Sequence, residues 1–193
     1  MESLTVDKLN LRSRAENGKI YFTVADLEAF PEWPDGPLLE LVNGDLYVVP
    51  SPNTEHQDLS AEILYQIKSF LKTKAIGRVF SAPYDVMFSD EDSAVPDIVY
   101  VAKENEKIIT SKNIQGTPDL IVEITSNNRA RDFILKRNLY ERFKTKEYWI
   151  VDPKEKKVLI YLLNRDGAFD PPREHPFGEI LTVKSITGLS LQL

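Results

Sequence analysis

The segment 119–125 (DLIVEIT) combines the alternation of a β-strand with a carboxylate that the interior of a sheet accommodates poorly. Its aliphatic residues at positions 120, 122 and 124 point to one face of such a strand, and Glu123 points to the other. Because an unpaired buried carboxylate is costly, Glu123 needs a cation beside it, either a metal ion or a lysine. The fold must therefore bring that cation to this strand.

Asp97 and Lys136 are the residues that could complete such a site. Asp97 follows a proline and begins a strand-like run, and Lys136 lies in the helical pattern after Glu123. Two carboxylates at a sheet edge can bind a hard cation such as Mg²⁺. The cation activates a water, and a lysine beside it adds a fixed positive charge. These are the minimal parts for metal-dependent hydrolysis of a phosphodiester bond.

Each candidate residue also has a structural interpretation when it is taken alone. Asp97 can be an ordinary residue of a Pro-Asp turn. Lys136 shares a helical stripe with Asp132 and Tyr140, four positions away on either side, which is also the pattern of a surface ion pair with an aromatic edge. His56, near the start of a predicted helix, could contact a phosphate or a metal-bound water, or could cap or pack that helix.

Composition excludes several classes of site. The 193 residues suffice for one well-cored domain, and a hydrophobic content of 42% with 28% charged residues is typical of a globular protein. No apolar run approaches the length of a membrane span, and no secretory signal is evident. The lack of cysteine excludes disulfides and thiol nucleophiles and is typical of a cytoplasmic protein. We expect a polar arm over residues 1–18 and a single domain over 19–193.

The distribution of charge leaves two interpretations open. A net charge of −6, from 24 basic and 30 acidic residues, argues against a sequence-blind coat protein for nucleic acid. The segments 63–84 and 129–146 are nevertheless basic. They could form a local phosphate-binding face or be solvated faces of helices.

Local patterns predict the order of elements. Thr23 and Asp26 form a capping-box pattern before a short helix that ends near Pro31, and Asn43-Gly44 predicts a hairpin. A second helix is expected over about 59–71, closed by Gly77, and a third over about 130–143. Strands are expected near 79–80, 85–88, 97–102, 119–125, 147–151, 158–163, 180–183 and 189–193, with turns or loops at 89–93, 103–116 and 164–177. This order indicates an α/β fold of α+β character, in which helices pack on a mixed sheet.

Pro96-Asp97, then Glu123-Ile124-Thr125, then a lysine resemble the PD-(D/E)XK nuclease superfamily, which has the restriction-endonuclease-like fold. The chain more specifically resembles the Uma family of putative restriction endonucleases, which is abundant in cyanobacteria. The supporting segments are 40–44, 95–97, 118–124, 132–136 and 147–153, together with His56 at a helix start.

The resemblance implies a Mg²⁺- or Mn²⁺-dependent DNA endonuclease that acts as a homodimer. It implies that Asp97, Glu123 and the carbonyl of Ile124 bind the metal and that Lys136 is the catalytic lysine. Glu40, His56 and Tyr140 are accessory candidates. The chain departs from the superfamily at Thr125, where the lysine usually stands, and the Uma-like arrangement supplies Lys136 from the following helix instead. The loop at 127–129 also departs from the family pattern.

Two alternatives follow from the same residues. The nuclease fold can be retained for DNA binding or protein association with little or no catalysis, because fold does not fix function. The acids can also belong to structural ion pairs. Binding of Mg²⁺ or Mn²⁺ that requires both Asp97 and Glu123 separates a metal site from the second alternative.

Overall fold

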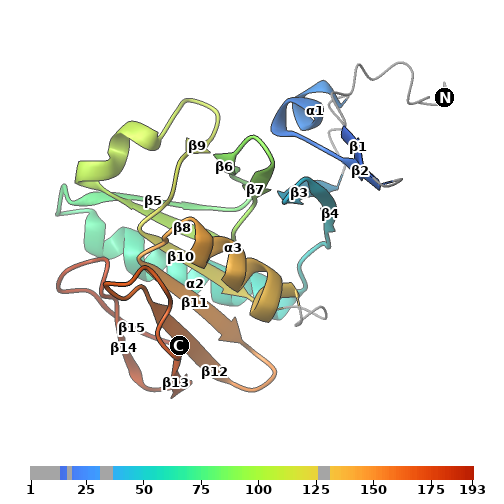
Figure 1. Ribbon diagram of the computed structural model, residues 1–193. Coiled ribbons are helices and arrows are strands. Elements are labelled where there is room, and N and C mark those ends of the chain that lie inside the picture. The colour runs from blue at the N-terminus through green and yellow to red at the C-terminus, as the bar shows by residue number, and fades with distance from the viewer. Residues whose placement is uncertain (1–13, 17–18, 31–36, 126–130) are drawn as a thin grey trace.

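The computed structural model describes residues 14–16, 19–30, 37–125 and 131–193, and its centre is a six-stranded mixed sheet (Figure 1). The strands lie in the order β13 (Arg173–Pro176), β12 (Lys157–Leu162), β11 (Glu147–Asp152), β10 (Leu120–Ile124), β8 (Ile98–Ala102) and β5 (Gly77–Ser81). Within this sheet, β10 and β11 pair in parallel, and the other described neighbours are antiparallel. The expected mixed sheet is confirmed.

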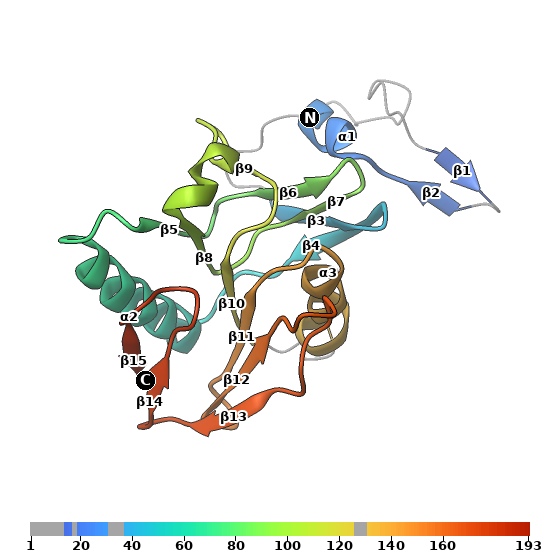
Figure 2. The same cartoon turned by 60° about the vertical axis from the view of Figure 1, so that its left-hand side comes forward.

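A second sheet of five strands adjoins the first (Figure 2). Its order is β4 (Asp45–Val49), β3 (Leu38–Val42), β7 (Asp92–Ala94), β6 (Val86–Ser89) and β9 (Ile114–Gln115). Two short antiparallel pairs lie apart from these sheets: β1 (Arg14–Glu16) with β2 (Lys19–Tyr21), and β14 (Ile180–Thr182) with β15 (Ser190–Gln192). Strand β1 falls within the expected N-terminal arm, most of which lies outside the described residues.

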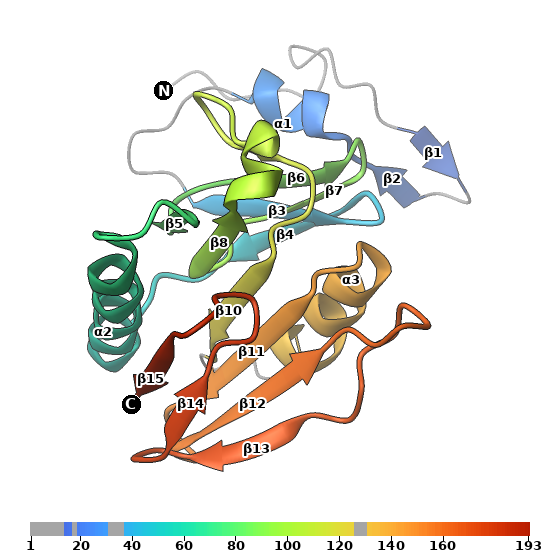
Figure 3. The same ribbon diagram turned by 90° about the vertical axis from the view of Figure 1, so that its left-hand side faces the viewer.

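Helices cover both faces of the six-stranded sheet (Figure 3). Helix α2 (Thr54–Leu71) buries Ile63 and Ile67 on one face, in the core that contains Trp149. On the other face, a π-helical segment (Arg131–Lys136) leads into α3 (Arg137–Arg142), whose Leu139 and Tyr140 are buried. No described helix is long and apolar enough to cross a membrane.

Strand β10 is therefore buried on both faces. Its residues Leu120, Val122 and Ile124 belong to the core under α2, as the alternation predicts. Ile121 belongs to the core under α3, and Glu123 shares its face by alternation. The carboxylate of Glu123 thus faces the α3 side of the sheet.

Two local predictions are confirmed. Thr23 caps helix α1 (Val24–Ala29), and its side chain and that of Asp26 form the reciprocal bonds of a capping box. Asn43 and Gly44 connect β3 to β4 with φ angles of +52° and +75°, the left-handed geometry that a two-residue hairpin turn requires.

The prediction that Gly77 closes the second helix is wrong. Helix α2 ends at Leu71, and Gly77 is instead the first residue of β5. A Cβ atom at Gly77 would lie 2.4 Å from the carbonyl oxygen of Val101 on the neighbouring strand. The glycine is therefore needed for the close approach of two strands.

Three stretches predicted as turn or loop contain regular structure. The turn expected at 89–93 is shorter, because β7 begins at Asp92 and pairs with β6. The stretch 103–116 contains a 3₁₀ helix (Lys103–Ile108) and β9. The stretch 164–177 contains β13, which forms an edge of the main sheet. These strands are two to four residues long, so their own sequences are too short to show a periodicity.

Candidate functional site

Asp97 lies beside Glu123 because of the register between β8 and β10. The last pair of that antiparallel ladder is Ile98 with Val122, so the next positions are Asp97 and Glu123. The ladder ends there, and the Asp97 carboxylate accepts the Ile124 N–H at 2.7 Å. Asp97 and Glu123 thus occupy the same end of the sheet.

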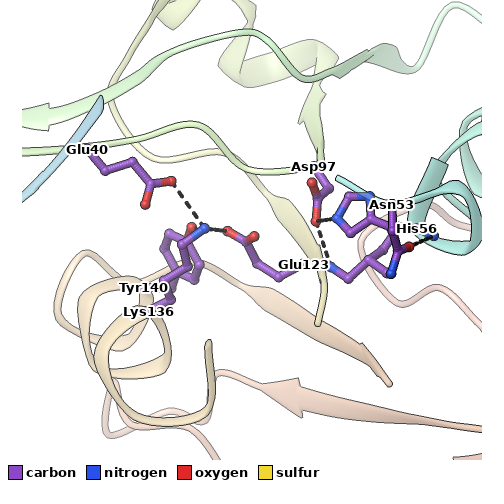
Figure 4. Close-up of polar contacts among 8 residues, drawn as sticks. Glu40, Asn53, His56, Asp97, Glu123, Lys136 and Tyr140 are labelled. Carbon is purple, nitrogen blue, oxygen red and sulfur yellow. Dashed lines mark hydrogen bonds and ion pairs between the residues drawn. The ribbon is translucent and has the colours of Figure 1, made fainter. Parts of the chain in front are cut away.

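Lys136 lies between two buried carboxylates (Figure 4). Its ammonium nitrogen is 2.8 Å from Oε1 of Glu123 and 3.1 Å from Oε1 of Glu40. All three residues are at most 5% exposed. The cation that Glu123 requires is therefore supplied, in this structure, by the lysine of the following helical segment.

Tyr140 reaches the same carboxylate from one helical turn further along. Its hydroxyl donates to Oε1 of Glu123 at 2.5 Å, and its ring packs edge-on against Tyr148. The spacing of four that places Lys136 and Tyr140 on one stripe thus directs both at Glu123 (Figure 4). The side chain of Asp132, the third member of that stripe, lies outside the described residues.

Glu40 connects the second sheet to the site. It lies in β3 and accepts the Val95 N–H at 2.9 Å in addition to its contact with Lys136. The Val95 N–H holds the Glu40 carboxylate in place, and Glu40 and Glu123 together hold the Lys136 ammonium from two sides. The structure places Glu40 beside the lysine.

His56 reaches the site from the first turns of α2. Asn53 caps this helix by accepting the His56 N–H at 2.9 Å. The imidazole Nε2 lies 3.1 Å from Oδ2 of Asp97 (Figure 4). Neither sequence interpretation of His56 included a contact with Asp97, 41 residues away. A sequence pattern carries no signal for a pairing of that separation.

Five of the seven candidate residues line one cavity of about 420 Å³. Asp97, Glu123, Ile124, Lys136 and His56 all line it. The carboxylates of Asp97 and Glu123 are therefore not sealed in the core, although each is largely buried, and a small charged ligand can reach them.

The charges and donor types of the site suit a divalent cation. The carboxylates of Glu40, Asp97 and Glu123 with the ammonium of Lys136 carry a formal sum of −2. Carboxylate and carbonyl oxygens are the ligands of Mg²⁺, which usually keeps several waters. Within the described parts of the chain, no three acidic or histidine side chains already form a metal cluster. The residues present fit a hydrated hard cation rather than a fully caged ion.

The basic segment 129–146 is largely committed to contacts within the protein. Arg137 pairs with Glu141 at 2.6 Å, Lys146 pairs with Asp119 at 2.6 Å, and Arg142 pairs with Asp92. Lys144 donates to the carbonyl oxygen of Gly167 at 2.6 Å. These side chains stabilise the α3 region, which disfavours the interpretation of this segment as a free phosphate-binding face.

Outside the site, burial perturbs the acidity of two tyrosines and one acid. Desolvation raises the pKa of Tyr100 to about 12, with further contributions from Asp119, Glu104 and Glu106. Burial also raises the pKa of Asp85 and that of Tyr161. All of these shifts favour the neutral form of the group.

Comparison with known proteins gives a consistent result. A family model described as "Uma2: Putative restriction endonuclease" matches residues 27–193. A crystal structure described as a putative nuclease belonging to DUF820 from Anabaena variabilis ATCC 29413 superposes with a TM-score of 0.72. The match covers 89% of this chain and 94% of that chain at 23% sequence identity, which shows a shared fold. No curated protein matches the chain.

Proposed function

Because the chain belongs to the Uma2 family of putative restriction endonucleases, we propose that it is a metal-dependent nuclease that hydrolyses phosphodiester bonds in DNA. One observation carries the proposal. Buried Lys136 lies within ion-pair distance of Glu123, and the register of β8 and β10 places Asp97 beside that same glutamate. Two acids and a lysine are thus brought to one end of a sheet from three separate segments.

In this proposal Asp97, Glu123 and the carbonyl of Ile124 hold Mg²⁺ or Mn²⁺. Such a cation, when bound, activates water and offsets charge on the phosphate. The Ile124 N–H and His56 orient the Asp97 carboxylate through the bonds described above. This orientation is set by the backbone of β10, so it does not depend on a flexible side chain alone.

Lys136 supplies a fixed positive charge beside the phosphate. An ammonium carries three N–H bonds, and the described residues give this one two carboxylate partners, Glu40 and Glu123. The third N–H bond can be directed at a phosphate oxygen. A charge fixed in advance stabilises the anionic transition state without reorganisation at the moment of reaction. Glu40 and Tyr140 act as positioning residues, because each contacts Lys136 or Glu123.

The proposal extends to a single catalytic domain over 19–193, a cytoplasmic location and a homodimer. A two-fold dimer would present one active site to each strand of a duplex. Sedimentation velocity on the purified chain tests the dimer directly. A monomer at every concentration used for cleavage would exclude it.

Cleavage of supercoiled plasmid with Mg²⁺ or Mn²⁺ tests the proposed reaction. We expect wild type to nick or linearise the plasmid and Asp97→Asn and Lys136→Met to lose about 10²-fold or more of that rate. Asp166→Asn, in an exposed turn, and Lys154→Met, in the turn after β11, are matched controls that should cleave like wild type. Equal cleavage by all variants would refute the assignment. A wild type that binds Mn²⁺ but never cleaves would favour the binding-module alternative.

A further inference from the structure

The cavity beside the candidate site has a wall that the proposed chemistry does not use. Helix α2 contributes Gln57, Ser60, Ala61 and Leu64 to the lining. These positions follow the spacing i, i+3, i+4 and i+7, so they form one stripe of the helix. Ile63 and Ile67 are buried in the core between α2 and the sheet, and Leu64 also packs against that core. The stripe thus lines the cavity and borders the core at Leu64.

Another part of the lining comes from the open end of the β3–β4 hairpin. Val49, which pairs with Leu38 at that end, lines the cavity together with Pro50. Among the described residues, the charged side chains of the lining are those of Asp97, Glu123 and Lys136, and the His56 imidazole is charged only when it is protonated. An uncharged, mainly apolar wall does not favour phosphate, because a phosphate would lose its hydration there without a compensating partner.

A nucleobase matches this wall in its chemistry. Its two faces are apolar, and enzymes that bind a single base hold those faces between apolar side chains and hydrogen-bond its polar edge. Val49, Pro50 and Leu64 supply apolar surface, and Gln57 and Ser60 supply donors and acceptors on the same stripe. The volume of about 420 Å³ lies within the range of small-molecule sites, which is roughly 300–1,000 Å³.

We propose that this cavity binds one unstacked nucleobase of the nucleotide next to the bond that is cleaved, so that the substrate is a nucleic acid with unpaired nucleotides. The proposal rests on the proposed nuclease function, because the same cavity holds Asp97, Glu123 and Lys136. A base that is paired and stacked in a duplex cannot enter the cavity until it is extruded. Single strands and unpaired positions avoid that cost.

Cleavage of matched oligonucleotides tests the preference. We compare a labelled single strand, the same strand in a complete duplex, and a duplex with one unpaired nucleotide, each with Mn²⁺. The single strand should be cut at least about tenfold faster than the complete duplex, because extrusion of a paired base raises the barrier. In the third substrate the cut should lie beside the unpaired nucleotide. Equal rates on the single strand and the complete duplex would overturn the proposal.

Two substitutions on α2 assign the preference to the cavity. Ala61→Phe places a ring in the cavity from an exposed position, where it should not prevent folding. Ser69→Phe adds the same ring at an exposed position of the same helix that does not line the cavity. We expect Ala61→Phe to lose the preference for unpaired nucleotides and Ser69→Phe to keep it. A preference that survives in Ala61→Phe would contradict the assignment.

Two further measurements separate this proposal from the nuclease function. Bis(4-nitrophenyl) phosphate has no nucleobase, so its hydrolysis reports on the proposed catalytic residues alone. Its hydrolysis together with equal cutting of single strand and duplex would retain the nuclease and reject the base site. If nothing is hydrolysed, the nuclease function fails. The cavity is then tested by titrating a single strand that contains 2-aminopurine with the protein, in the presence of Ca²⁺. A saturable fluorescence rise that Ala61→Phe abolishes supports the base site, and its absence in wild type rejects it.

Discussion

Lys136→Met should destabilise the protein far more than a surface lysine substitution does. Methionine keeps the apolar stem and removes the ammonium, so Glu40 and Glu123 lose their shared buried cation. At distances of 2.8 and 3.1 Å, an effective dielectric constant of 20 gives attractions of about 6 and about 5 kcal/mol. Desolvation of the ammonium offsets much of this sum, and removal of one partner from a buried pair typically costs about 3–5 kcal/mol.

Urea denaturation measures this loss, and thermal unfolding should show a fall in Tm of roughly 6–20 °C for a chain of this length. Lys154→Met, in an exposed turn, is the control and should change the unfolding free energy by less than about 0.5 kcal/mol. Adding Glu40→Gln to Lys136→Met should restore part of the stability, because one uncompensated charge is removed. A loss below about 1 kcal/mol for Lys136→Met would refute the reasoning.

Three other predictions concern the framework of the fold. Gly77→Ala should lower the unfolding free energy by about 2–5 kcal/mol, from backbone strain and the contact of the new Cβ with Val101. Gly178→Ala, whose new Cβ would have no atom within 4 Å, should lower it by about 1–2 kcal/mol. Equal urea midpoints for the two variants would contradict this prediction. Thr23→Ala should cost about 1 kcal/mol through loss of the α1 cap, and an unchanged midpoint would show that the cap contributes nothing. Burial raises the pKa of Tyr100 to about 12, so the folded state retains a proton that the unfolded state loses near pH 10. Stability should therefore fall as the pH rises from 10 to 12. Tyr100→Phe should reduce this dependence on pH in urea denaturation, and an unchanged dependence would contradict the prediction.

Features fixed by neighbouring residues could be predicted from the sequence. The Thr23 capping box and the Asn43-Gly44 turn each depend on interactions within four residues. The apolar alternation of 120, 122 and 124 likewise identified the core face of β10. The cap, the turn and the strand alternation are each determined by residues that are close together in the sequence.

Features that depend on distant partners could not be predicted. Strand β7 is three residues long and polar, and its Asp92 is buried against Arg142 and the Asn43 N–H, about 50 residues away in either direction. The role of Gly77 is set by the carbonyl of Val101 on another strand. The alternation in 119–125 did not predict that β10 is buried on both faces. The second face is covered by α3, whose position depends on the rest of the fold.

The candidate site lies between these two cases. The sequence identified Asp97, Glu123 and Lys136, and the structure brings Asp97 and Lys136 each to the neighbourhood of Glu123. The sequence could not show that Glu40 adjoins Lys136 or that His56 contacts Asp97, because each of these contacts joins two elements that are far apart in the chain. The roles of these residues in metal binding and cleavage stay predictions.

Calorimetric titration with Mn²⁺ tests the central claim most directly, that Asp97 and Glu123 form a divalent cation site beside Lys136. We expect wild type to bind one Mn²⁺, Asp97→Asn and Glu123→Gln to lose that binding, and Lys136→Met to retain it in conditions where it is folded. Retention is expected because the cation and the ammonium share the Glu123 carboxylate, so removal of the lysine leaves the oxygen ligands in place. Binding that is absent in wild type, or equal in wild type and Asp97→Asn, would contradict the account.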